Sequence, residues 1–183
     1  MSQPQAASQP RDCPYFGLDY YEEEWGAWFF GREAERNKII TNLRASPLTP
    51  LHANSGVGKS SLLRAGVVAR LQELAHESVA RRGSARYVPV VFSSWRDDPI
   101  PPLITAIGTA IKPFLNGRPH PILPPQHLDK AIQQAADAVG ARLFIILDQF
   151  EEYFNYSAAE PTPERLASEV ATCINQPTSR PTS

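Results

Sequence analysis

Apolar residues along the chain recur with two different periods, which predict helices and strands in alternation. Apolar positions spaced three or four residues apart predict helices over 33–44, 59–74, 102–114, 126–139 and 163–174. Two runs rich in β-branched or consecutive apolar residues, 87–93 and 143–147, predict strands, and a shorter apolar approach to a third strand ends at Leu51. Helices alternating with strands indicate an α/β fold built on a parallel sheet, with 143–147 buried on both faces.

The segments between these elements are polar or rich in proline and glycine. Residues 76–86 carry several arginines around Gly83 and predict a surface loop, and a second loop is expected over 149–152. The folded domain is expected to span 13–175. The flanking segments 1–12 and 176–183 are rich in Gln, Ser, Pro and Thr and predict disordered tails.

Charge and cysteine content narrow the class of protein. The 183 residues have a formal net charge of −1, which predicts no general affinity for nucleic acid. Cys13 and Cys173 lie far apart without the spacing of metal ligands, and we expect two reduced thiols in a cytoplasmic protein. The chain contains no stretch of about 20 apolar residues, so no membrane span is predicted.

The stretch 49–65 has the pattern of a phosphate-binding loop. A short apolar approach leads into small residues, and Gly58-Lys59-Ser60 is followed at once by a helical pattern. Ala53 stands where the motif has its first glycine, which is tolerable if that position needs no positive φ. The alternative is an ordinary glycine-containing turn before a core helix. The predicted nucleotide-binding residues of this loop are Asn54, Ser55, Gly56, Val57, Gly58, Lys59, Ser60 and Ser61.

A carboxylate at the end of the second predicted strand fits the other half of such a site. Asp148 closes the apolar run 143–147, at the strand end where open α/β sheets bind ligands. Lys59 is predicted to reach the terminal phosphates, and Ser60 and Asp148 to hold Mg²⁺. Glu151 and Glu152 follow closely, so either could polarise an attacking water as a catalytic residue. The alternatives are that Asp148 caps the next turn and that both glutamates are solvated.

These motifs together resemble one family. The chain is similar to the novel STAND NTPase 1 group of P-loop NTPases over roughly 13–175. The resemblance is carried by four segments, namely 13–18 (Cys-Pro-Tyr-Phe-Gly-Leu), 29–35 (Phe-Phe-Gly-Arg-Glu-Ala-Glu), 55–66 (the Walker A region) and 147–152 (Leu-Asp-Gln-Phe-Glu-Glu, a Walker B form).

The resemblance implies a P-loop fold of the ASCE and STAND type, a three-layer α/β/α arrangement that binds ATP and Mg²⁺ and acts as a signalling switch. It gives Phe30, Gly31 and Arg32 a role beside the adenine base. Relatives have a further strand and a sensor residue after the last predicted helix, and the chain ends shortly after that helix. We therefore expect an incomplete sheet, in which the first and third strands either pair directly or leave a gap, with weak binding and little or no hydrolysis.

Two other functions stay open from the sequence. The chain could be a non-enzymatic interaction module, in which a protein partner or a second copy supplies the missing strand by β-augmentation. A P-loop kinase that acts on a small substrate is less favoured, because no cluster of arginines follows the Walker B segment.

Overall fold

Two parallel strands form the centre of the molecule. The computed structural model describes residues 31–54, 56–156 and 163–175. Strand β1 (Tyr87–Phe92) pairs with β2 (Arg142–Leu147) in a register that sets Tyr87 opposite Arg142 and Phe92 opposite Leu147. The carboxyl ends of both strands therefore lie side by side at the same end of the sheet. The predicted strands over 87–93 and 143–147 and their parallel direction are confirmed.

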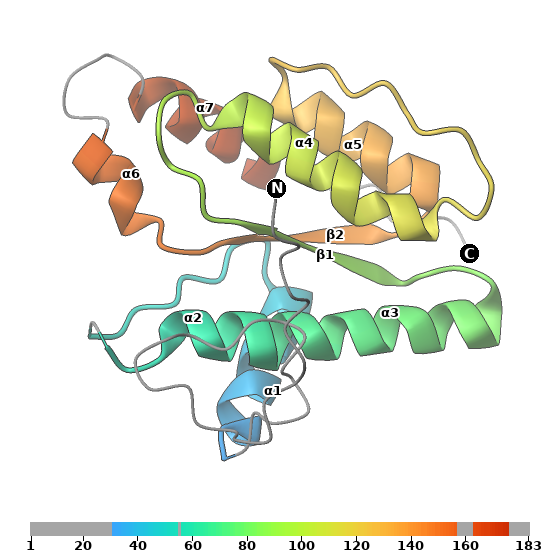
Figure 1. Cartoon of the computed structure of the whole chain (residues 1–183), viewed down its shortest axis with the longest axis horizontal. Coiled ribbons are helices and arrows are strands. Elements are labelled where there is room, and N and C mark those ends of the chain that lie inside the picture. Colours follow the sequence, from blue (N-terminus) through green and yellow to red (C-terminus); the bar gives the residue numbers. More distant parts are fainter. Residues whose placement is uncertain (1–30, 55, 157–162, 176–183) are drawn as a thin grey trace, which may run out of the picture.

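One face of the sheet is covered by the N-terminal helices (Figure 1). These are α1 (Glu33–Ala45), α2 (Lys59–Ser61), the π-helix η2 (Leu62–Val68) and α3 (Ala69–Arg82). Ile40 of α1 and Val67 of η2 belong to one apolar cluster with Phe144 and Ile146 of β2. This cluster fixes the helix that follows the glycine-containing loop against the strand that ends at Asp148.

The later helices cover the opposite face (Figure 1). They are α4 (Ile100–Ile111), the short 3₁₀ helix η3 (Lys112–Phe114), α5 (Leu128–Val139) and α7 (Pro163–Asn175), while α6 (Glu151–Tyr156) follows β2 directly. Leu143, Ile145 and Leu147 of β2 pack against the larger core on this side. Successive residues of β2 thus contact opposite helical layers, which confirms the α/β class and the packing of β2 on both faces.

The predicted strand that ends at Leu51 is not formed. Residues 47–54 have no strand assignment, and the side chains of Leu48 and Leu51 are 59% and 40% exposed. Pro47 and Pro50 lack the amide N–H that a strand donates to its neighbour, which disfavours pairing here. Within the described residues the sheet consists of β1 and β2 alone, so direct pairing of the first and third expected strands does not occur.

Two predicted loops are partly helical. The segment 76–86 was expected to be a surface loop, but α3 continues to Arg82 because Ala75 and Val79 still pack against the core; Gly83 then ends the helix. The expected loop over 149–152 contains the first turn of α6, which no apolar periodicity signals in so short a helix. No helix in the described part of the chain is long and apolar enough to cross a membrane.

Candidate functional site

The glycine-containing loop owes its shape to Gly56 and Gly58. Their φ angles are 79° and 75°, in the left-handed region that other residues avoid. Ala53 is not among the residues with positive φ, so a side chain at that position costs the backbone nothing there. The departure of this chain from the usual first glycine is therefore compatible with the loop.

The ammonium group of Lys59 is held by the loop itself. Its Nζ atom donates to the backbone carbonyl of Ala53 at 3.0 Å and to that of Asn54 at 3.2 Å. Lys59 begins the helix that follows the loop, so these bonds bring its charge back across the turn. A phosphate bound in the loop would offer the same ammonium a stronger, charged acceptor.

Arg32 reaches the same loop from the start of α1. Its Nη1 atom donates to the carbonyl of Val57 at 2.9 Å and to that of Gly58 at 3.4 Å. The Arg32 side chain also pairs with Glu35, and this hydrogen bond holds the pKa of the Glu35 carboxyl below its usual value. Arg32 therefore links the first helix to the backbone of the loop, a contact that the sequence did not predict.

Asp148 connects the loop helix with the end of β2. Ser60 donates from Oγ to Asp148 Oδ1 at 2.9 Å, and the two residues are 88 positions apart in the sequence. The carboxylate is 3% exposed and is the one buried charged side chain in the described part of the molecule. The structure thus brings together the two residues that the sequence assigned to a cation.

Arg64 forms an ion pair with the other oxygen of the Asp148 carboxylate. Its Nε atom lies 3.1 Å from Asp148 Oδ2, and its Nη2 atom donates to Ser93 Oγ at 2.9 Å. Arg64 lies in the π-helix η2. The N–H of Ala69 donates to the carbonyl of Arg64, five residues earlier, and this spacing makes the helix locally wider than an α-helix. No role was predicted for Arg64 from the sequence, although its place four residues after Ser60, on the same face of a helix, is a signal.

The backbone of Asp148 is fixed as firmly as its side chain. Its N–H donates to the carbonyl of Phe92 at 2.9 Å, and its own carbonyl accepts a 2.7 Å bond from Trp95 Nε1. Trp95 is buried and meets the rings of Phe92 and Phe150 edge to face. The role of Trp95 was also missed; a bulky aromatic residue among the charges of the 95–99 loop is the signal that could have revealed it.

Glu151 and Glu152 lie in the first turn of α6, after Gln149, whose φ of 55° is unusual for a residue with a side chain. Glu151 is exposed and Glu152 is half-buried. No hydrogen bond or ion pair within residues 31–54, 56–156 and 163–175 holds either carboxylate. Both are therefore free to turn toward a ligand at the end of β2, and their catalytic role stays a prediction.

The donor set suits a hard divalent cation that keeps water and phosphate ligands. No group of three or more His, Cys, Asp or Glu side chains gathers in the described part of the chain. Ser60 and Asp148 offer a hydroxyl and a carboxylate oxygen, the donor types that Mg²⁺ prefers, and Mg²⁺ needs few protein ligands beside a bound phosphate. The pair therefore fits Mg²⁺ and does not fit a zinc site.

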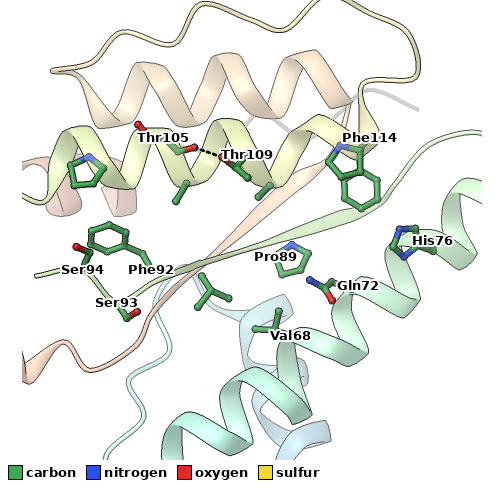
Figure 2. A pocket seen from close by; sticks show the side chains of 15 residues that line it. Val68, Gln72, His76, Pro89, Phe92, Ser93, Ser94, Thr105, Thr109 and Phe114 are labelled. Carbon is green, nitrogen blue, oxygen red and sulfur yellow. Dashed lines mark hydrogen bonds between the residues drawn. The ribbon is translucent and has the colours of Figure 1, made fainter. Parts of the chain in front are cut away.

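A separate groove of about 640 Å³ lies between α3 and α4, along the outer edge of β1 (Figure 2). Val68, Pro89, Phe92 and Phe114 contribute to its largely apolar lining. The lining includes no Asp, Glu, Lys or Arg, so the groove has no charged group to hold a phosphate or a cation. It meets the site at Phe92, whose carbonyl accepts from the Asp148 N–H, and at Ser93, which Arg64 contacts.

Of the remaining predicted site residues, the structure describes some and not others. Phe30 and Ser55 lie outside the described residues, as do both expected tails and Cys13. Gly31 donates its N–H to Glu33 Oε1 at 3.2 Å and precedes Arg32 at the loop. Ser61 continues the helix after Ser60.

Comparison with known proteins agrees with the motifs. The family model described as Novel STAND NTPase 1 matches residues 14–180, which is most of the chain. No curated protein and no solved structure matches the chain.

Proposed function

The chain belongs to the Novel STAND NTPase 1 family, and on that premise we propose that it is a P-loop domain that binds ATP together with Mg²⁺. Family membership supports nucleotide use in general. The choice of ATP, the three-layer ASCE arrangement and a role as a cytoplasmic signalling switch are parts of the proposal that follow from the resemblance.

One contact carries the proposal, namely the hydrogen bond from Ser60 to Asp148. In a P-loop site the hydroxyl after the lysine and the acidic residue at the end of a neighbouring strand serve the same cation. The 2.9 Å distance between Ser60 Oγ and Asp148 Oδ1 supports such a shared role. An acidic residue that only capped a turn would have no reason to meet this serine.

The residues from Gly56 to Ser60 would then each contribute to binding. The backbone amides of Gly56, Val57 and Gly58 would surround a phosphate, and the helix that starts at Lys59 adds favourable partial charge. The Lys59 ammonium would exchange its two carbonyl acceptors for phosphate oxygens. Ser60 and Asp148 would hold Mg²⁺, which when bound neutralises phosphate charge.

Hydrolysis would depend on Glu151 and Glu152. Both follow Asp148 on α6, and one of them would orient and deprotonate water as a general base. We propose slow turnover, because both carboxylates lack the hydrogen bonds that would fix a catalytic base within the described residues.

The direct test is calorimetric titration of the full chain with Mg²⁺-ATP. The Lys59→Ala variant should lose at least about tenfold in affinity, because a charged hydrogen bond to phosphate contributes about 1.5–3 kcal/mol. Lys38→Ala, which changes an exposed lysine of α1, should bind like wild type and serves as the matched control. Equal affinities of wild type and Lys59→Ala would refute the assignment of the loop.

A second function, a non-enzymatic interaction module, is favoured by one observation. In the described part of the chain β2 pairs only with β1, so its other edge is open to an added strand, and Leu48 and Leu51 are exposed. A homo-oligomer or a complex with a protein partner would supply that strand. Light scattering that shows a monomer with a single cooperative melting transition would count against this function.

A further inference from the structure

The candidate site contains a cation of its own, the guanidinium of Arg64. Asp148 is 3% exposed, and its two carboxylate oxygens accept from Ser60 and from Arg64. The Arg64 side chain is 15% exposed, so the pair is largely shielded from water. A buried carboxylate without an opposite charge is strongly unfavourable.

We propose that Arg64 is a positioning residue that acts as the internal counter-cation of Asp148 and that Mg²⁺ takes over this role when nucleotide binds. This inference rests on the proposed function, because it assigns the same carboxylate to Mg²⁺. Arg64 would stabilise the metal-free protein and oppose the ion, since both positive charges share one carboxylate. The coupling between Arg64 and Mg²⁺ is therefore antagonistic.

Arg64 has a second polar contact that does not involve Asp148. Its Nη2 atom already donates to Ser93 Oγ at the end of β1, 2.9 Å away. Ser93 also lines the groove along the outer edge of β1, so in our proposal the guanidinium keeps Ser93 as its partner when Mg²⁺ takes Asp148. The wider turns of the π-helix at 62–68 place Arg64 where it contacts both strand ends.

The alternative is a purely structural tether, in which Arg64 joins the helix to β1 and β2 and is indifferent to the metal. Both roles predict that loss of Arg64 lowers the melting temperature. Only the counter-cation role predicts that the size of this loss depends on Mg²⁺. The test must therefore compare the variant with and without the ion.

The experiment measures the ATP affinity of the full chain in Mg²⁺ and in EDTA, for wild type and Arg64→Gln. The ratio of the two dissociation constants, EDTA over Mg²⁺, gives the Mg²⁺ enhancement. We expect this enhancement to be about threefold or more larger in Arg64→Gln than in wild type. The loss of melting temperature caused by Arg64→Gln should also be smaller in Mg²⁺-ATP than in EDTA. An equal or smaller enhancement in the variant overturns the proposal.

A matched control lies on the same continuous helix. Arg70 pairs with Glu73 at 2.8 Å and with Glu77 at 3.4 Å, on an exposed face away from Asp148. Arg70→Gln removes the same charge from the α3 part of this continuous helix, and its Mg²⁺ enhancement should equal that of wild type. A changed enhancement in Arg70→Gln would overturn the assignment to Arg64, because a general charge effect would then explain the result.

A second measurement keeps the proposal testable if Arg64→Gln does not fold or if the chain binds no ATP. Arg64→Gln combined with Asp148→Asn removes both members of the buried pair. The counter-cation role predicts that this double variant melts at a higher temperature than Arg64→Gln alone, because no lone buried charge remains. An additive loss in the double variant would overturn the role. Absence of ATP binding in wild type would refute the proposed function separately.

Discussion

Trp95 Nε1 donates a 2.7 Å hydrogen bond to the backbone carbonyl of Asp148. Asp148 follows β2 directly and Trp95 lies three residues after the end of β1, so this bond joins the ends of both strands at the candidate site. The same loop continues to Asp98, whose carboxylate lies 2.8 Å from Arg165 of α7. The position of Asp148 is therefore linked through one short loop to the last described helix.

We predict that Trp95→Phe destabilises the protein by about 2 kcal/mol. Phenylalanine keeps an aromatic ring among Phe92 and Phe150 but leaves the buried carbonyl of Asp148 without its donor, which costs about 1–3 kcal/mol. Urea unfolding at constant slope measures the loss.

A surface change provides the comparison for this prediction. Phe154→Leu alters an aromatic residue that is 63% exposed on α6, and its effect should stay within about 0.5 kcal/mol. A similarly small effect of Trp95→Phe would show that the hydrogen bond to Asp148 contributes little.

Arg32 is predicted to act on phosphate binding through the loop backbone. Its bonds to the carbonyls of Val57 and Gly58 would hold the loop in its binding shape. Arg32→Ala should weaken the affinity for ATP and for inorganic tripolyphosphate by a similar factor, about two- to tenfold, because one or two hydrogen bonds are lost. Titration with both ligands measures the two factors.

The base-free ligand separates this role from the one that the family resemblance implies. If Arg32 served only the adenine base, Arg32→Ala would weaken ATP binding and leave tripolyphosphate binding unchanged. Arg36→Ala, which changes another arginine of α1, is the matched control and should bind both ligands like wild type.

The sequence predicted the elements that depend on regular apolar spacing. The helix α1 and the strands β1 and β2 lie within one residue of their expected ends, because each buries a regular pattern of apolar residues. The α/β class follows from their order. The segment that ends at Leu51 does not form the predicted strand. A strand needs a neighbouring strand to pair with as well as apolar residues, and within the described residues this segment pairs with no strand.

The candidate site was predicted only where a local motif defines a residue. Lys59, Ser60 and Asp148 stand at fixed places in such motifs. Arg64 and Trp95 were missed because their contacts with Asp148 span 84 and 53 positions and depend on how the helix and the loop pack on the strands. Long-range contacts of this kind leave no periodic signal in the sequence.

The environment of Cys173 leads to a prediction about the stability of the protein at alkaline pH. Burial, together with the charges of Asp129 and Glu169, raises the pKa of its thiol to about 11. The folded protein therefore keeps this proton more tightly than the unfolded chain, whose thiol has a pKa of about 8.5. The resulting stability is present below about pH 8.5 and is lost as the pH rises through about 11.

The measurement compares unfolding free energies between pH 8 and 11 in a Cys13→Ser background. The protein that retains Cys173 should lose more stability over this range than its Cys173→Ala counterpart, which lacks the titrating thiol. Parallel curves for the two proteins would contradict a raised pKa of this thiol.

The measurement that tests the central claim most directly is the Mg²⁺ dependence of ATP affinity in Asp148→Asn. If Ser60 and Asp148 hold one cation beside the bound nucleotide, the variant should lose at least about tenfold in affinity in Mg²⁺ and bind like wild type in EDTA. Asp137→Asn, which removes an exposed carboxylate of α5, should behave as wild type in both buffers. An Asp148→Asn protein that folds and keeps the full Mg²⁺ dependence of wild type would contradict the account.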